Sequence, residues 1–100
     1  SQVALNISII ANRLKNYEFA YFLAKLSEKQ FILSRLEKTH SVEKMSNYLQ
    51  LANIYQSNNK LDDYNRAMKE AEMVFNTHYD ELKDSAYAPY FQPITKIAKN

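Results

Sequence analysis

Two histidines, His40 and His78, are the side chains of this sequence best suited to acid–base or metal chemistry. Imidazole titrates near neutral pH and binds metal ions, but either role needs a carboxylate or a second histidine nearby in the fold. His78 has Asp80 and Glu81 close in sequence, whereas His40 lies at a predicted helix end. Because His-x-x-Glu alone is a weak pattern, we expect no metal site and no cofactor.

The other polar residues form no recognisable catalytic pattern. The sequence has no Cys and no Gly, which excludes a thiolate nucleophile and a glycine-rich phosphate loop. Asp62 and Asp63 open a predicted helix, where acidic side chains stabilise the positive end of the helix dipole. No order of Ser, His and Asp residues indicates an activated serine. We therefore expect a protein that is not an enzyme.

The eight Tyr and five Phe residues could in principle stack on nucleic-acid bases. However, the 13 Lys+Arg and 11 Asp+Glu residues are interspersed, whereas nucleic-acid binders concentrate Lys and Arg on one face. Six of the aromatic residues fall on predicted core stripes of helices: Tyr17, Phe31, Tyr48, Tyr55, Tyr64 and Phe75. Core packing accounts for these six better, and we expect no direct binding to nucleic acid.

The elements that must position all these residues are predicted to be helices. Gly is absent and Pro occurs only at Pro89 and Pro93, whereas a small sheet protein needs several tight turns. Apolar residues recur at three- and four-residue spacing and predict helices over 2–14, 17–38, 42–57, 61–83 and about 92–99. The longest apolar run is too short to span a bilayer, and no signal peptide is visible. We therefore expect a cytoplasmic protein with no membrane partner.

The first half of the sequence matches the second half after a shift of 44 residues. The matched pairs include Ile7 with Leu51, Ser8 with Ala52, Ala11 with Tyr55, Ser27 with Ala71 and Phe31 with Phe75. A further step of 43 residues places Ile94, Thr95 and Ala98 over the first three of these positions. Each unit is predicted to be a shorter helix, a polar turn and a longer helix. We expect one domain over 1–100, with units of about 2–41 and 42–85 and the first helix of a third from about 86, as part of a longer array.

The second unit resembles the tetratricopeptide repeat, in its spacing Tyr48-x-x-Leu51-Ala52-x-x-Tyr55 followed by a polar turn and Tyr64…Ala71. The usual period of that family is 34 residues, so this chain resembles a long-helix variant. Lys15 and Asn59 stand where Gly is common in the family. The resemblance implies an all-α fold of antiparallel helical hairpins stacked as a short solenoid. A four- or five-helix bundle with accidental self-similarity is the alternative.

In such repeats the first helices line a groove that holds a peptide or partner segment, and the resemblance implies the same here. The residues expected to line the groove are Asn6, Ile9, Asn12 and Arg13, with Leu5, in the first unit, and Leu49, Gln50, Asn53 and Gln56 in the second. Asn and Gln both donate and accept hydrogen bonds, which suits the backbone of an extended chain. Solvated surface is the alternative for these amides, and Lys25 and Lys69 are expected on the outer faces.

Tyr87, Tyr90 and Phe91, around Pro89, lie outside any clear helical stripe and form a possible end patch for a partner. We therefore predict a non-catalytic module that binds a protein or an extended peptide in the groove, with self-association left open. One alternative is the peptide-sensing or dimerisation segment of a bacterial regulator. A small free-standing helical-bundle binding protein is another.

Overall fold

The computed structural model describes residues 2–33 and 41–91, and every regular element in these ranges is a helix. Four longer helices come first: α1 (Gln2–Arg13), α2 (Tyr17–Leu33), α3 (Ser41–Ser57) and α4 (Leu61–Thr77). Two single-turn helices follow, α5 (Tyr79–Leu82) and α6 (Ala88–Phe91). The predicted all-α fold class is confirmed. None of the described helices is long and apolar enough to cross a membrane.

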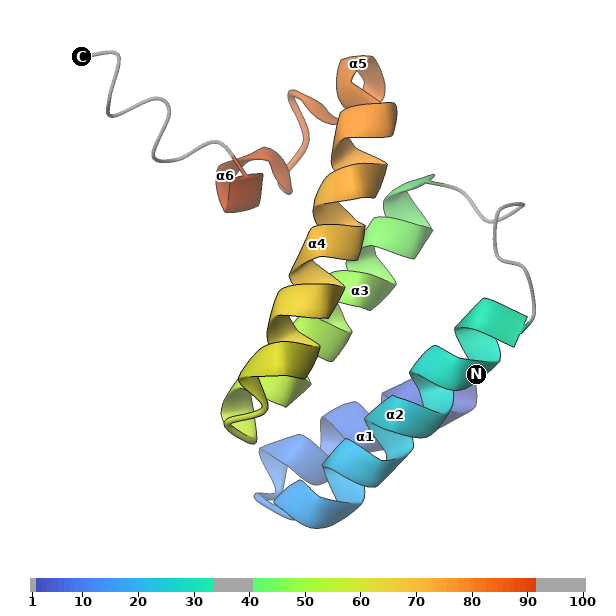
Figure 1. Ribbon diagram of the computed structural model, residues 1–100, viewed down its shortest axis with the longest axis vertical. Coiled ribbons are helices and arrows are strands. Elements are labelled where there is room, and N and C mark those ends of the chain that lie inside the picture. The colour runs from blue at the N-terminus through green and yellow to red at the C-terminus, as the bar shows by residue number, and fades with distance from the viewer. Residues whose placement is uncertain (1, 34–40, 92–100) are drawn as a thin grey trace.

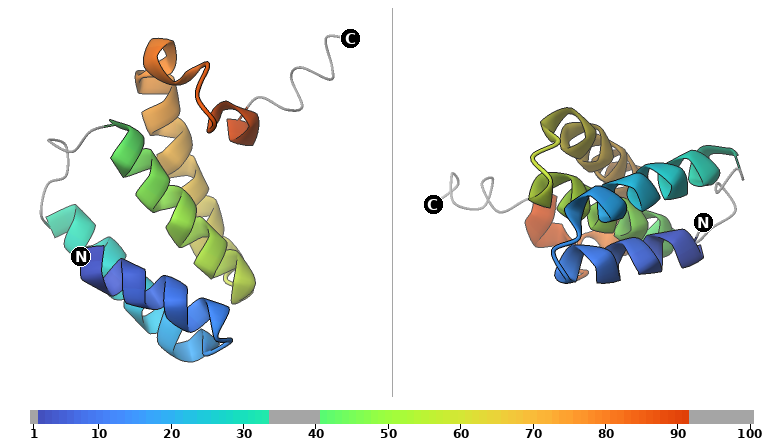
Figure 2. Two further views of the ribbon diagram at one scale, coloured as in Figure 1. Left: turned by 180° about the vertical axis from the view of Figure 1, so that it is seen from behind. Right: turned by 90° about the horizontal axis from the view of Figure 1, so that it is seen from below.

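The four longer helices form two antiparallel hairpins, α1 with α2 and α3 with α4 (Figure 1). The second hairpin packs beside the first, and α3 contacts both α1 and α2. The two further views show the same pairing, with the N-terminal hairpin on one side of α3 and α4 (Figure 2). The helical hairpins predicted from the repeat are therefore present.

The two hairpins turn in the same way at positions 44 residues apart. Lys15 and Asn59 both have the left-handed backbone, with φ of 64° and 59°. After α1, Lys15 N–H donates to Asn12 O and Asn16 N–H donates to Ala11 O. After α3, Asn59 N–H and the next N–H donate to the matching carbonyls of Gln56 and Tyr55. These bonds satisfy the last carbonyls of each first helix, as in the Schellman motif, so the chain reverses tightly without Gly.

Small residues allow the helices of each hairpin to approach closely. Ser8 is fully buried in α1, and its hydroxyl donates to the carbonyl of Ala20 at 2.5 Å. The matching residue of α3, Ala52, is 1% exposed and faces α4. The close crossings lie among larger core side chains, the largest of which are Tyr55, Phe75, Leu5, Met45, Leu51 and Ile54. The core thus spans both hairpins.

The predicted helix faces are partly wrong. Tyr48, Tyr55 and Phe75 are buried as expected, and Tyr64 packs partly buried against the core. Tyr17 is 42% exposed and does not belong to the core, which contradicts its predicted place on a core stripe. The side chain of Phe31, also predicted for the core, lies outside the described residues.

The fourth helix was predicted to reach residue 83, but α4 ends at Thr77. A turn at His78 separates it from α5, and after Leu82 the chain folds back along α4 (Figure 1). Phe91 in α6 packs on Phe75, with ring centroids 4.9 Å apart. This long-range contact between aromatic rings draws the C-terminal segment back to the hairpin. The last part of the helix predicted over 17–38, residues 34–38, and the helix predicted over about 92–99 lie outside the described residues.

Candidate functional site

A pocket of about 440 Å³ opens between α3, α4 and the 87–90 segment. Its lining brings together six residues that the sequence placed in two separate groups. They are Leu49, Gln50, Asn53 and Gln56 from the predicted groove, and Tyr87 and Tyr90 from the predicted end patch. The fold-back of the chain after α5 therefore joins the groove of the second unit and the end patch into one site.

The pocket has an apolar floor and an amide rim. Ala52, Tyr64 and Met68 form the floor, and all three are buried or packed against the core. Gln50, Asn53 and Gln56 are exposed along α3. Such a combination suits a ligand that buries a few apolar side chains and offers polar groups at the edge.

The residues of the end patch have different roles. Tyr87 is partly buried against the core, and Phe91 is held by Phe75. Tyr90 is 60% exposed and also lines a smaller neighbouring hollow of about 290 Å³ beside Lys69 and Glu72. Tyr90 is therefore the member of the patch that is free to contact a partner on both of its sides.

The first-unit residues predicted for the groove do not reach this pocket. Leu5 is fully buried and Ile9 packs against the core. The side chain of Asn12 is bonded to the second turn, since it donates to Ser57 Oγ at 3.3 Å and accepts from Asn58 Nδ2 at 3.5 Å. Asn6 and Arg13 are exposed on α1. Among the described residues, the predicted groove residues of the first unit are therefore separate from the pocket of the second unit.

A comparison of equivalent residues in the two units explains why the pocket lies on the second hairpin and not on the first. The pocket residues Leu49, Ala52 and Gln56 correspond, 44 residues earlier, to Leu5, Ser8 and Asn12. In the first unit that face of the hairpin is covered by α3, which buries Leu5 and bonds to Asn12. In the second unit the same face is covered only in part, by Tyr87 and by Tyr90 of the single-turn helix α6, and the pocket lies beside them.

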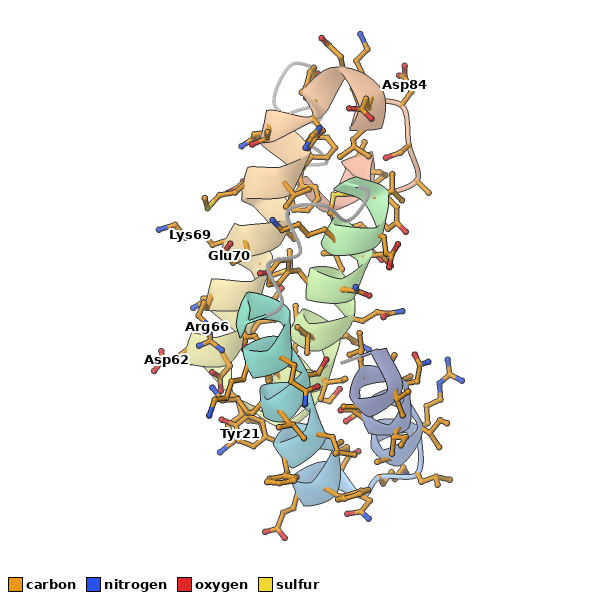
Figure 3. All side chains as sticks on the ribbon, turned by 90° about the vertical axis from the view of Figure 1, so that its right-hand side faces the viewer. Tyr21, Asp62, Arg66, Lys69, Glu70 and Asp84 are labelled. Carbon is orange, nitrogen blue, oxygen red and sulfur yellow. The ribbon has the colours of Figure 1, made fainter. Side chains whose placement is uncertain are left out.

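A charged network that the sequence analysis missed joins the two hairpins. Glu28 of α2 is 5% exposed and accepts from Arg66 Nη2 at 2.6 Å, Arg66 Nε at 3.0 Å and Tyr55 Oη at 2.7 Å. Asp63 of α4 accepts from Tyr21 Oη at 2.7 Å and pairs with Arg66 at 2.8 Å. Tyr21 and Arg66 lie on the same side of the molecule, where α2 passes α4 (Figure 3).

The network also includes Lys25, which was predicted on an outer face. Its side chain is 44% exposed, and its Nζ lies 3.1 Å from Asp63 Oδ1. The spacing Tyr21, Lys25, Glu28 on α2 follows one helix face, and Asp63 and Arg66 follow one face of α4. That pattern was visible in the sequence, but only the packing of α2 on α4 pairs the two faces.

The electrostatics of the network indicate a structural function. Burial acts to raise the pKa of the Asp63 carboxyl, but hydrogen bonds from Tyr21, Arg66 and Lys25 outweigh it and lower the pKa to about 2. Burial and the bond to Glu28 raise the pKa of Tyr55, and the same carboxylate raises the pKa of Arg66. These contacts stabilise the ionised forms of Asp63 and Arg66 and the neutral form of Tyr55, so the network holds the two hairpins together.

Of the two histidines considered for chemistry, His78 is the one that lies among the described residues. His78 Nδ1 lies 3.2 Å from Glu81 Oε1 on the surface, at the turn between α4 and α5. His40 lies outside the described residues. Within residues 2–33 and 41–91, no group of three His, Cys, Asp or Glu side chains is arranged to hold a metal ion.

Comparison with known proteins returned no match for this chain among protein-family models, curated proteins or solved structures.

Proposed function

We propose that this chain is a non-catalytic interaction module that holds a helical segment of a partner protein in the pocket of its second hairpin. The observation that carries the proposal is the first hairpin, whose equivalent face is occupied by α3. A face built to the same pattern, with a small residue at Ala52 and aliphatics beside it, is suited to the same kind of occupant.

The pocket chemistry supports a short apolar anchor with polar flanks. A volume of about 440 Å³ accommodates a few side chains, and the floor of Ala52, Tyr64 and Met68 offers them an apolar surface. Asn53 and Gln56 can bond to polar groups of the partner on either side of that anchor. An amphipathic helix presents such a pattern along one face.

This proposal keeps the interpretation of the chain as a tetratricopeptide-like module, but the bound segment of the partner is a helix and not an extended peptide. The other two contexts, a segment of a bacterial regulator and a free-standing bundle, would use the same pocket. A cytoplasmic partner belongs to the proposal as well.

The proposal is tested with helical peptides selected from a displayed library on the immobilised chain. We expect the selected peptides to shift backbone amide resonances of residues 46–56 and 87–90. Asn53→Ala should weaken their binding about 3- to 10-fold, because a lost hydrogen bond costs about 0.5–1.5 kcal/mol. Tyr90→Ala should weaken it further through lost apolar contact.

Asn76→Ala provides the matched control, because Asn76 is an exposed amide on α4 outside the pocket lining. It should leave binding unchanged, and circular dichroism should show all three variants folded. Selected peptides whose resonance shifts map away from the pocket, or whose affinity is unaffected by Asn53→Ala and Tyr90→Ala, would exclude this site.

A further inference from the structure

The first hairpin carries a row of exposed aliphatic side chains on α1. Val3, Ile7, Ile10 and Leu14 follow one another at spacings of four, three and four residues, which places them in one stripe. Their exposed fractions are 70%, 43%, 55% and 76%. Single exposed aliphatics are ordinary on a protein surface, but a continuous stripe of four indicates an interaction surface.

Two exposed aromatic residues extend this surface onto α2. Phe19 is 46% and Phe22 is 63% exposed, and Leu23 beside them is only partly buried. Seen from below, α1 and α2 lie in front of α3 and α4, and none of the described helices covers them (Figure 2). We refer to Val3, Ile7, Ile10, Leu14, Phe19 and Phe22 together as the apolar face.

The 44-residue repeat shows which surface of the second hairpin corresponds to the apolar face. Shifted by 44 residues, the apolar face corresponds to Asn47, Leu51, Ile54, Asn58, Asp63 and Arg66 of the second hairpin. Those residues lie where the second hairpin meets the first. Leu51 and Ile54 are buried, Asn58 bonds to Asn12 of α1, and Asp63 and Arg66 bond to α2. The apolar face is therefore the equivalent of a covered interface, and none of the described helices lies on it.

The apolar character of the face determines which kind of surface can pack on it. Within the chain, Tyr21, Lys25 and Glu28 of α2 meet Asp63 and Arg66, so polar groups meet polar groups. The corresponding residues of α4 are Asn65, Lys69 and Glu72. If copies stacked head to tail, these would meet Phe19 and Phe22 and bury charges without partners, which is unfavourable. The apolar face is instead complementary to another apolar face.

We propose that two copies of this chain associate through the apolar face, each presenting the same six residues about a two-fold axis. The interface is isologous, because the same surface serves on both copies. The α1 stripe has the four-three-four spacing with which two helices pack side by side, and Phe19 and Phe22 extend the contact on its flank. The face consists of six residues, whereas a standard interface has about 20–30 residues a side, so we expect a weak dimer with a dissociation constant of about micromolar or higher.

The test is sedimentation velocity of the 100-residue chain at loading concentrations from low micromolar to near-millimolar. We expect the mass to rise from 11.7 kDa to twice that value and then to stay constant. Ile10→Glu places a charge in the centre of the stripe and should weaken the dimer at least ~10-fold. Phe22→Glu, on the other helix, should act in the same direction, so that a folding defect in one variant does not decide the result.

Asn53→Glu is the matched control, because Asn53 is exposed on α3 in the pocket, away from the apolar face. It should dimerise like the unchanged chain. The proposal is overturned by a chain that stays monomeric at every concentration, or by Ile10→Glu and Phe22→Glu variants that are folded and still dimerise. It is also overturned if Asn53→Glu breaks the association or if the mass grows without limit, since both outcomes indicate head-to-tail stacking. None of these results depends on whether the pocket binds a partner helix.

Discussion

Asp63 is a short carboxylate in the first turn of α4, and three donors from two helices surround it. Its side chain is 12% exposed, so these donors replace most of its contact with water. The ionised form is the one they stabilise, which is why the pKa falls to about 2 against an ordinary 3.8. The unfolding free energy of the protein should therefore depend on the ionisation of Asp63 at acidic pH.

We expect the unchanged chain to lose about 2 kcal/mol of unfolding free energy as the pH falls from about 4 to about 2 through Asp63 alone. The native pKa lies below the unfolded one, so the contribution is complete above pH 4 and disappears as the native carboxylate takes up its proton. Urea denaturation followed by circular dichroism, at several pH values in this range, measures the loss.

Asp63→Asn should be less stable at neutral pH and should show a correspondingly smaller decrease on acidification. The exposed neighbour Asp62 supplies the control, because Asp62→Asn removes a carboxylate outside the network. If both variants show the same pH dependence as the unchanged chain, Asp63 does not carry the effect.

At the scale of the element, the turns hold a measurable conformational strain. Lys15 adopts a left-handed backbone with φ of 64°, which costs a residue with a Cβ about 1 kcal/mol relative to Gly. We expect Lys15→Gly to raise the unfolding free energy by about 0.5–1 kcal/mol, after allowance for the greater freedom of Gly in the unfolded chain. Thermal and urea unfolding measure this gain.

Two comparisons sharpen that prediction. Asn59→Gly should give a smaller gain, since Asn tolerates the left-handed region better than Lys does. Asn16→Gly should give none, because Asn16 is not among the described residues with positive φ. A stabilisation by Asn16→Gly as large as that by Lys15→Gly would refute the explanation by backbone strain.

The sequence predicted the helices and turns well because their signals are local. Asn58 and Asn59 favour a left-handed turn, and the 44-residue match locates the corresponding turn at Lys15. The buried face of α1 was not predictable in the same way. Aliphatics at Leu5, Ile7 and Ile9–Ile10 surround most of this helix, so spacing alone does not select a face, and the packing of α2 and α3 buries Leu5 rather than Ile7.

Six of the ten residues that line the pocket were predicted from the sequence. The resemblance to the tetratricopeptide repeat indicated Leu49, Gln50, Asn53 and Gln56, and Tyr87 and Tyr90 were singled out because no helical stripe accounts for them. Their meeting in one pocket depends on the break at His78 and on the packing of Phe91 against Phe75. No Gly or Pro beside His78 marks the end of the helix in the sequence. Aromatic packing between distant residues also leaves no local sequence signal.

At the scale of the whole molecule, the Glu28–Arg66 pair joins the hairpins through two hydrogen bonds of 2.6 and 3.0 Å. Removing one partner leaves the buried carboxylate with less compensation, so Arg66→Ala should destabilise the protein by about 1–3 kcal/mol. The value is below that for fully buried pairs because the Arg66 side chain is 43% exposed. Chemical denaturation of the variant measures it.

The double variant Glu28→Gln with Arg66→Met distinguishes a lost pair from lost packing. Because it removes both charges, it should be more stable than the single variant Arg66→Met, and the cycle that Glu28→Gln completes gives the coupling free energy across the hairpins. Additive effects of the two single changes would mean that the pair does not join the hairpins energetically.

The tight turns at Lys15 and Asn59 also bear on how quickly the chain folds. Each connects two helices whose contacts lie close in sequence, so little entropy is lost in closing the intervening loop. Chains dominated by such local contacts have low contact order and fold in roughly microseconds to milliseconds. Each hairpin has its own turn, whereas the Glu28 and Asp63 bonds join residues of different hairpins, so we expect them to form after the hairpins. These bonds should therefore slow unfolding while leaving the folding rate nearly unchanged, so the long-range contacts set the lifetime of the native state and the short-range ones set the speed of reaching it.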